Sequence, residues 1–375
     1  MSRGRVVIAT TVHPICDVRI LYREARSLAR AGYDVEVIGP SPAPESALGI
    51  EGVRLTLIPH EVGRFRRAVI SGARLGRMLF KRRPDVVHLH DPELLWLGLV
   101  QRITGRRVVF DLHEDLPLQI LAKEWIPRPL RRIASWVSAA SLRLVAGRFA
   151  GLVAATDVVA KRLPARKRPV VVRNFPVIEL MTSPKTRQDA ATRFVYVGRI
   201  SQDRGAAEML RAVENLAHLD VRLALVGVAS DDVREAVANS TAADRIELIP
   251  WEPPLRVYDR LSQADVGLVC LHPLQRYVDA LPVKLFEYMA AGLPVIASDF
   301  PGLRAIVEEA DCGLLVNPLD VHSLSEAMCR LAESPEERRR LGANGRRAIA
   351  ERYNWRSEEA KLLELYARLL QPKTR

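Results

Sequence analysis

Short runs of β-branched and aliphatic residues alternate with helical patterns along almost the whole chain, and this alternation limits the possible folds more than any other feature. The runs are apolar on both faces, which is typical of buried parallel strands. The first expected strands are Val6–Thr10, Asp34–Ile38, Val53–Ile58, Val86–Leu89, Val108–Phe110 and Leu152–Ala155. The second series is Phe194–Val197, Arg222–Val226, Arg245–Ile249, Val266–Cys270, Pro294–Ala297 and Leu314–Val316. Two such series predict an α/β protein with two doubly wound, Rossmann-like domains.

The chain has 375 residues, enough for two or three domains. We expect a first domain over residues 1–176 and a second over residues 193–355. Residues 177–192 are polar and contain a proline, so we assign them to a linker. An amphipathic helix over Ser357–Leu370 ends the chain, and we expect residues 356–375 to cross back to the first domain.

The net charge of +12 is unevenly distributed. Residues 1–170 hold 29 Lys and Arg against 15 Asp and Glu, whereas the remainder is close to neutral. This asymmetry indicates an anionic partner for the first half, such as nucleic acid, anionic lipid or a phosphorylated substrate. The four cysteines are far apart, which argues against a disulfide framework or zinc cluster. Because no run is long and apolar enough for a membrane span or a secretory leader, we expect a cytoplasmic protein.

The segment Asp279–Asp299, DALPVKLFEYMAAGLPVIASD, carries the strongest functional signal. Pro282 suits the first turn of a helix, and Gly292 is suited to its end. Lys284 then lies near the helix N-terminus, where the macrodipole disfavours a cation. A bound anion explains this lysine, although an ordinary surface lysine beside Glu287 is an equal alternative.

A second segment, Tyr196–Gly205, has the sequence YVGRISQDRG. A strand ends at Gly198, a loop carries Arg199 and Arg204, and a helix follows. Two guanidinium groups beside a helix N-terminus could bind a diphosphate, but two solvated arginines explain the segment equally simply.

Titratable side chains end two neighbouring strands of the first series. His88, His90 and Asp91 end one strand, and His113 and Glu114 follow the next. The carboxyl ends of parallel strands share one edge of a sheet, so these groups predict a catalytic and sugar-binding site or a metal site. Backbone hydrogen bonding at the strand ends is the simpler alternative, above all for His88.

The loop Thr10–Arg19 follows the first strand but contains no glycine, which argues against a dinucleotide-binding dehydrogenase. His13, Asp17 and Arg19 could face the cleft, although Asp17 is equally suited to capping a helix. The chain has no nucleophile elbow, no P-loop, no HExxH motif and no DxD triplet. Arginine and lysine are therefore the expected phosphate ligands, and no metal is expected.

Together these segments resemble the retaining GT-B-fold glycosyltransferases of family four. The resemblance covers nearly the whole chain and is most specific in DALPVKLFEYMAAGLPVIASD, VYVGRISQDRG, SQADVGLV and Tyr353–Trp355. The first half is similar to a subgroup with D-x-R, H-x-H-D and D-x-H-E motifs, here Asp17–Arg19, His88–Asp91 and Asp111–Glu114. The resemblance implies that the two domains face a cleft.

The resemblance also implies roles for individual residues. Glu287 would bind the ribose, while Arg199 and Arg204, with Lys284 and Leu285, would hold the diphosphate of a nucleoside diphosphate sugar. His113, Glu114 and Asp279 would be the catalytic residues at the donor sugar. His13, Asp17, His90 and Asp91 would lie on the acceptor side. Asp279 replaces the usual glutamate of the family motif and is one methylene shorter, which bears on sugar identity.

The implied reaction is transfer of a sugar to an acceptor hydroxyl with retention, in polysaccharide or glycolipid assembly, without a metal cofactor. A carbohydrate or lipid-linked acceptor is the expected partner. Two other enzyme classes stay open at this point, a nucleotide-sugar epimerase and a metal-dependent hydrolase built on His90, Asp91, His113 and Glu114. A nucleic-acid-binding protein is disfavoured, because aromatic residues make up only 6% of the chain and form no stacking platform.

The segment Arg64–Arg83 has the pattern of a basic amphipathic helix. On a helical wheel one side gathers Phe65, Ala68, Val69, Leu75, Leu79 and Phe80. The other side gathers Arg67, Arg74, Arg77 and Lys81, flanked by Arg64 and Arg66. We therefore expect an anionic membrane surface as a further partner, with the protein peripheral on the inner face of the cell membrane.

Overall fold

The computed structural model describes residues 2–41, 50–121, 123, 126–182, 191–278 and 280–371. The chain divides into two compact units, one of Met1–Asn174 with Trp355–Arg375 and the other of Phe175–Asn354. Much of the expected linker, residues 183–190, lies outside the described residues. Its first part belongs to the second unit, since Leu180 and Met181 pack against the core there.

The first unit is built on a seven-stranded parallel sheet in the order β3-β2-β1-β4-β5-β6-β7. Its strands are β1 (Arg5–Ala9), β2 (Asp34–Pro40), β3 (Val53–Ile58), β4 (Val86–Leu89), β5 (Arg107–Leu112), β6 (Gly151–Ala154) and β7 (Val170–Val171). This confirms the predicted doubly wound class. The two-residue strand β7 is too short to show a sequence pattern, and the sequence analysis missed it.

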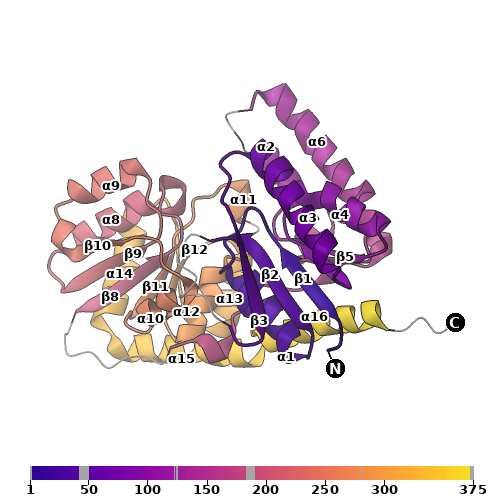
Figure 1. Ribbon diagram of the computed structural model, residues 1–375. Coiled ribbons are helices and arrows are strands. Elements are labelled where there is room, and N and C mark those ends of the chain that lie inside the picture. Colours follow the sequence, from indigo (N-terminus) through magenta and orange to yellow (C-terminus); the bar gives the residue numbers. More distant parts are fainter. Residues whose placement is uncertain are drawn as a thin grey trace. The chain divides into compact units, whose positions relative to one another are not determined.

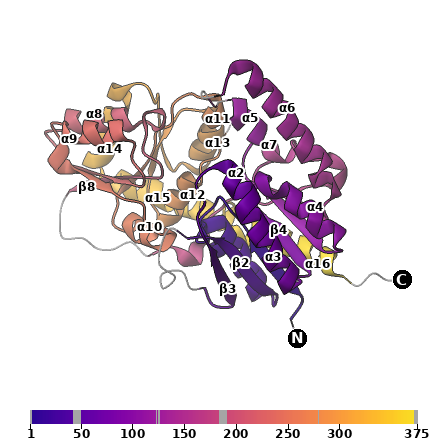
Figure 2. The same cartoon turned by 45° about the horizontal axis from the view of Figure 1, so that its top comes forward.

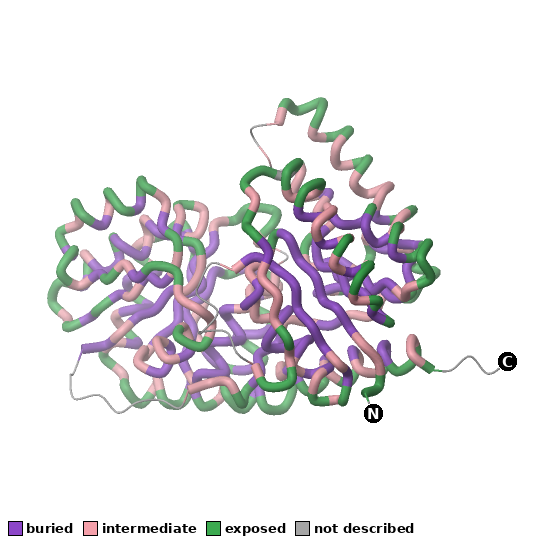
Figure 3. Tube along the Cα trace, viewed as in Figure 1, coloured by how far each residue is buried: buried purple, intermediate pink, exposed green. Residues whose placement is uncertain are grey.

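Helices cover both faces of this sheet (Figures 1 and 2). They are α1 (Arg26–Arg30), α2 (Arg64–Arg66), α3 (Gly72–Arg82), α4 (Leu95–Ile103), α5 (Leu116–Leu121), α6 (Arg128–Leu144), α7 (Asp157–Ala160) and α16 (Trp355–Leu370). Leu79 of α3, Leu97 of α4 and Leu142 of α6 belong to one core cluster with the strands, so these three helices share a face. In Figure 3 the strands are mostly purple, that is, buried.

The first helix begins where the sequence predicts. The carboxylate of Asp17 accepts hydrogen bonds from the backbone N–H groups of Arg19 and Ile20, so Asp17 is the N-cap. The segment Val18–Ala25 is a π-helix that continues into α1, and Gly32 follows with a positive φ of 89°. The wide turns place Arg19 and Glu24 among buried apolar side chains.

The second unit contains a six-stranded parallel sheet in the order β10-β9-β8-β11-β12-β13. Its strands are β8 (Thr192–Val197), β9 (Val221–Val226), β10 (Ile246–Ile249), β11 (Val266–Val269), β12 (Val295–Ser298) and β13 (Gly313–Val316). Its helices are α8 (Ala206–Asn215), α9 (Asp231–Ala238), α10 (Pro254–Leu261), α11 (Gln275–Val278), α12 (Val283–Ala291), α13 (Pro301–Ala310), α14 (Val321–Glu333) and α15 (Pro335–Glu351). The predicted second domain is thus a second doubly wound sheet.

The helix α12 has the ends that the sequence predicts. Pro282 is its N-cap residue, and Gly292 ends it in the left-handed conformation with φ of 79°. All residues of α12 from Lys284 to Ala291 are buried, including the charged Lys284 and Glu287. A helix buried on every side explains why it shows no clean amphipathic period.

The C-terminal helix α16 packs on the first unit, as expected. Its Trp355 is 4% exposed and donates a hydrogen bond from Nε1 to Ser27 Oγ at 2.8 Å. Near the other end, the Tyr366 hydroxyl lies 2.9 Å from His88 Nδ1. Glu358 accepts a hydrogen bond from the backbone N–H of Arg173. In Figure 1 the yellow α16 runs beside α1.

The helical wheel of Arg64–Arg83 is only partly correct. Leu75 and Leu79 are buried, whereas Phe65 and Phe80 are exposed. A π-helical segment, Arg67–Ser71, interrupts the regular period and rotates the residues before it relative to those after it. None of the helices that the structure describes has the length and hydrophobicity of a membrane span.

We expect Trp355→Ala to destabilise the first unit by about 3–5 kcal/mol, because it removes a buried indole and its hydrogen bond to Ser27. Urea unfolding monitored by circular dichroism measures the change. The control Glu364→Ala alters an exposed residue of the same helix and should leave the transition unchanged. Equal stability of the two variants would contradict the docking of α16 on this unit.

Candidate functional site

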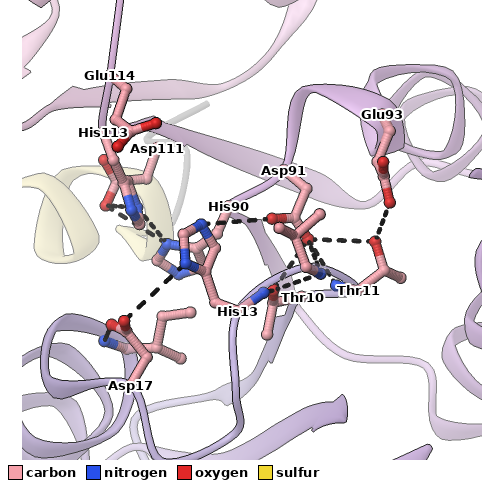
Figure 4. A network of polar contacts seen from close by, with 12 residues as sticks. Thr10, Thr11, His13, Asp17, His90, Asp91, Glu93, Asp111, His113 and Glu114 are labelled. Carbon is pink, nitrogen blue, oxygen red and sulfur yellow. Dashed lines mark hydrogen bonds and ion pairs between the residues drawn. The ribbon is translucent and has the colours of Figure 1, made fainter. Parts of the chain in front are cut away.

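Polar side chains of the first unit gather where β1, β4 and β5 end (Figure 4). Thr10 and Thr11 follow β1, His90 and Asp91 follow β4, and His113 follows β5. β1 lies between β2 and β4, so the chain reverses its winding direction at this point of the sheet. Such switch points are where open α/β sheets bind ligands.

Asp91 holds the loop after β1. Its Oδ2 accepts hydrogen bonds from Thr10 Oγ1 at 2.9 Å and from the backbone N–H groups of Thr11 and Val12. His13 lies on this loop, with its Nε2 at 3.7 Å from Asp91 Oδ1 and its Nδ1 at 4.0 Å from Asp17. The predicted acceptor-side residues are therefore neighbours. The carboxylates of Asp91 and Asp17 also accept hydrogen bonds from backbone N–H groups.

His90 and His113 contact each other directly, with His90 Nδ1 at 2.8 Å from His113 Nε2. Glu114 instead is exposed and accepts a hydrogen bond from Gln119. The four residues of the hydrolase alternative therefore do not converge on one point. Asp91 accepts hydrogen bonds from the backbone of the loop after β1, and Glu114 is exposed to solvent.

A charged cluster lies beneath His113, inside the unit. Arg19 donates from Nε to Asp111 Oδ2 at 2.7 Å and from a terminal nitrogen to Asp111 Oδ1 at 3.1 Å. The same Nε lies 3.0 Å from Glu24 Oε1. Glu24 Oε2 in turn lies 3.5 Å from His90 Nε2 and 3.7 Å from His88 Nδ1. All five side chains are almost fully buried.

The ligand types of Glu24, His88, His90 and Asp111 would suit a metal ion, and their ligand atoms lie within 4.8 Å of one another. However, the guanidinium of Arg19 already contacts both carboxylates. With both carboxylates ionised and both histidines neutral, the cluster carries one negative charge, so a divalent ion would leave a buried positive charge. A single added proton instead cancels the net negative charge of the cluster, and this favours a protonated Glu24.

The pKa directions agree with this charge count. Burial, together with the charge of Asp111, raises the pKa of Glu24 well above its usual range. Burial also tends to raise the pKa of Asp111. The charges of Arg19 and His113 have the larger effect and hold the pKa of Asp111 well below its usual range. Burial also lowers the pKa of His88 to about 4.

The sequence analysis assigned no role to Glu24, and it placed Arg19 at the cleft, whereas Arg19 is buried and pairs with Asp111. A signal existed for Glu24, because it lies four residues from Ile20 and from Leu28 on the apolar stripe of its helix. For Arg19 the D-x-R motif was the signal. Its partner Asp111 lies 92 positions away, and no local pattern joins the two.

The second unit has a cationic cradle at the end of β8. Gly198, with φ of 126°, lies against the tips of Lys284 and Arg204. A Cβ atom on Gly198 would lie 3.4 Å from Lys284 Nζ and 3.8 Å from Arg204 Nη1. Gly205 has φ of 74°, and a Cβ there would lie 2.5 Å from the carbonyl oxygen of Cys270. The positive φ of Gly198 favours glycine at the point where the loop meets both cations, and Gly205 lets the loop pack against Cys270 at the end of β11.

Lys284 is a buried cation without a hydrogen-bond acceptor among the described residues. Its Nζ lies 3.5 Å from the centroid of the Tyr196 ring, a cation–π contact that is weaker than an ion pair. Burial, with the nearby charge of Arg204, lowers the pKa of Lys284 well below its usual range. An anion bound at this point would remove both penalties.

The other predicted donor-site residues differ in placement. Arg204 donates from Nε to the Tyr277 hydroxyl at 3.3 Å, and the Tyr258 hydroxyl donates to Glu287 Oε1 at 3.3 Å. Arg199 is exposed on the loop after β8. Leu285 is fully buried in the core, so its side chain serves packing. Asp279 lies outside the described residues.

We expect His88→Gln to reduce the acid sensitivity of the protein. A histidine with a folded pKa of about 4 is protonated on unfolding below its unfolded pKa of about 6.5, so its contribution to stability is lost as the pH falls between these values. The loss is at most about 3 kcal/mol. Urea unfolding at pH 7 and pH 5 should show a smaller stability loss in the variant, and an equal loss in both proteins would contradict a neutral buried His88.

Comparisons with known proteins agree with this arrangement of two units. Residues 18–175 match the family model of glycosyltransferase family 4, and residues 180–348 match that of glycosyl transferases group 1. The MMP alpha-(1->4)-mannosyltransferase of Mycolicibacterium hassiacum is 27% identical, covering 92% of this chain and 93% of its own. The phosphatidyl-myo-inositol mannosyltransferase of Propionibacterium freudenreichii is 25% identical, covering 90% and 87%.

Among solved structures, Anabaena HepE in complex with UDP-glucose superposes with a TM-score of 0.72 at 14% identity, covering 97% of this chain and 100% of its own. This likeness concerns the fold alone. The relatives support transfer of a sugar in glycolipid or polysaccharide synthesis and do not favour an epimerase or a hydrolase. The two family models and the two parallel sheets show that this chain belongs to the GT-B glycosyltransferases of family four.

Proposed function

We propose that the protein transfers a sugar from a nucleoside diphosphate sugar to a hydroxyl of a carbohydrate or lipid-linked acceptor. The observation that carries the donor class is the buried, unpartnered Nζ of Lys284 beside Gly198 and Arg204. Two cations that share a cradle suit a diphosphate, which offers several anionic oxygens. The UDP-glucose complex of the structurally similar HepE is consistent with this donor class.

In this proposal Lys284 and Arg204 stabilise the negative charge that develops on the leaving diphosphate, which lowers the barrier to transfer. Arg199 is exposed and adds a second guanidinium from the same loop as Arg204. Glu287, whose carboxylate accepts a hydrogen bond from the Tyr258 hydroxyl, also accepts hydrogen bonds from the ribose hydroxyls. Leu285 contributes through the helix backbone rather than its side chain, and the family motif assigns Asp279 to the donor sugar.

The first unit supplies His113 to the donor sugar, while His13, Asp17, His90 and Asp91 form the acceptor side. Glu114 is the least supported of the proposed catalytic residues, because its carboxylate accepts a hydrogen bond from Gln119. We propose transfer with retention and without a divalent metal, since cationic side chains take the place of a metal at the diphosphate. The setting we propose is the cytoplasmic face of a membrane, where lipid-linked acceptors are found.

We expect Lys284→Met to weaken binding of a nucleoside diphosphate roughly ten- to a hundredfold, because it removes a charge-assisted contact. Phosphate binding should also raise the pKa of Lys284, which burial lowers in the free protein, so the complex holds more protons at pH values between the two pKa values. Calorimetry in buffers of different ionisation enthalpy should therefore detect proton uptake in the wild type and less of it in the variant. The exposed Arg211→Gln is the control. Unchanged affinity and proton uptake in Lys284→Met would refute the diphosphate cradle.

We expect His113→Ala to bind nucleoside diphosphate like the wild type and to transfer sugar at least about tenfold more slowly, since the lost contact concerns the sugar and not the phosphates. Mass spectrometry of reactions with a panel of nucleotide sugars measures transfer. Wild-type activity should persist in EDTA. Full activity of His113→Ala, or loss of wild-type activity in EDTA with recovery on adding Zn²⁺, would count against this assignment.

A further inference from the structure

The outer side of α6 is apolar, and none of the residues that the structure describes covers it. Leu130, Ile133, Trp136 and Val137 recur at helical spacing along one side and are all exposed, Trp136 by 72%. Leu142, the buried residue of this helix, lies on the opposite side. Most residues of α6 are green or pink in Figure 3, which marks exposed or intermediate burial. Single exposed apolar residues are common, but a continuous stripe along one helix indicates a binding surface.

The charged residues of α6 itself and of the segment that follows it are all basic. The sequence from Ile126 to Thr156 contains no aspartate or glutamate. Arg132 and Arg143 are exposed and flank the apolar side of α6, and Arg128 is exposed at its start. Neither α3 nor α4, which cover the same face of the sheet, contains an acidic residue. A helix with an apolar stripe and flanking arginines has the chemistry of a helix that lies in a membrane interface.

We propose that α6 lies in the headgroup region of an anionic lipid membrane, with Leu130, Ile133 and Trp136 toward the acyl chains and Arg132 and Arg143 on lipid phosphates. The stripe extends over 15 residues from Leu130 to Leu144, on the order of 20 Å at 1.5 Å per residue. This proposal deepens the proposed function, since a lipid-linked acceptor is presented at such a surface. It differs from the sequence prediction by assigning insertion to α6 rather than to Arg64–Arg83.

A second copy of the chain is the competing occupant, and charge argues against it. Two α6 helices packed stripe to stripe would bring their arginines together without an acidic residue from either helix to pair with them. An anionic bilayer instead supplies the opposite charge and an apolar layer at once. Trp136 also suits this position, because indole rings favour the interface between headgroups and acyl chains.

The test is flotation of the full chain with vesicles of phosphatidylcholine alone or with phosphatidylglycerol, at 0.1 M and 1 M salt. We expect binding to the anionic vesicles only, weaker at high salt because the Debye length falls from ~10 Å to ~3 Å. The variant Leu130→Gln with Ile133→Gln should bind at least about tenfold less. Leu319→Gln is a matched control in the second unit, because Leu319 and Leu130 are both 54% exposed.

Tryptophan emission locates the contact. Anionic vesicles should shift the emission of the wild type to the blue, and Trp136→Phe should abolish most of that shift. Equal flotation with neutral vesicles, no flotation at 0.1 M salt, or wild-type flotation of the double variant would overturn the proposal. A stable dimer that the double variant dissociates would assign the stripe to a second copy.

Calorimetric binding of a nucleoside diphosphate by the same variants keeps this outcome separate from the proposed function. Intact nucleotide binding without vesicle binding refutes only the membrane surface. Vesicle binding without nucleotide binding refutes only the donor class.

Discussion

The parallel pairing of strands is the constraint on which the rest of the molecule depends. Parallel strands all end at the same edge, so side chains that follow different strands meet there although they are distant in sequence. In the first unit this brings Asp91 to the loop after β1 and His113 to His90. In the second unit it places Gly198, at the end of β8, beside Lys284 of α12. Both clusters lie near the strand where the winding reverses.

The buried charged groups of the two units differ in the partners that they contact. In the first unit Arg19 and Asp111 form a bidentate pair, and one proton on Glu24 leaves the cluster neutral. In the second unit Lys284 is desolvated, lies over the ring of Tyr196 and has no hydrogen-bond acceptor among the residues that the structure describes. A buried cation without an anion costs folding free energy, and a ligand that supplies the anion recovers it. The first arrangement stabilises a scaffold, and the second is preorganised for a substrate.

Surface charge and surface hydrophobicity have to be considered together in the first unit. The first half of the sequence is basic. Its most basic helical segment, Arg64–Arg83, was the basis of the membrane prediction. In the structure Leu75 and Leu79 of that segment are buried in the core of the first unit. The helix α6 carries fewer charges than that segment, but its apolar stripe is exposed. Charge alone led to the prediction of an anionic partner, whereas the exposed apolar side chains are the basis on which we propose α6 as the contact.

The sequence by itself determined the fold class, nearly all the strands, the N-cap at Asp17 and both ends of α12, because local hydrogen bonding and burial on both faces leave local patterns. It also pointed to Lys284, which opposes the dipole of its own helix. Tertiary structure alone decided the pairing of Arg19 with Asp111, the separation of Glu114 from His90, and the contact of Glu24 with His90. Those contacts join residues from different strands and helices, and side-chain direction at a strand end depends on neighbours that no local pattern encodes.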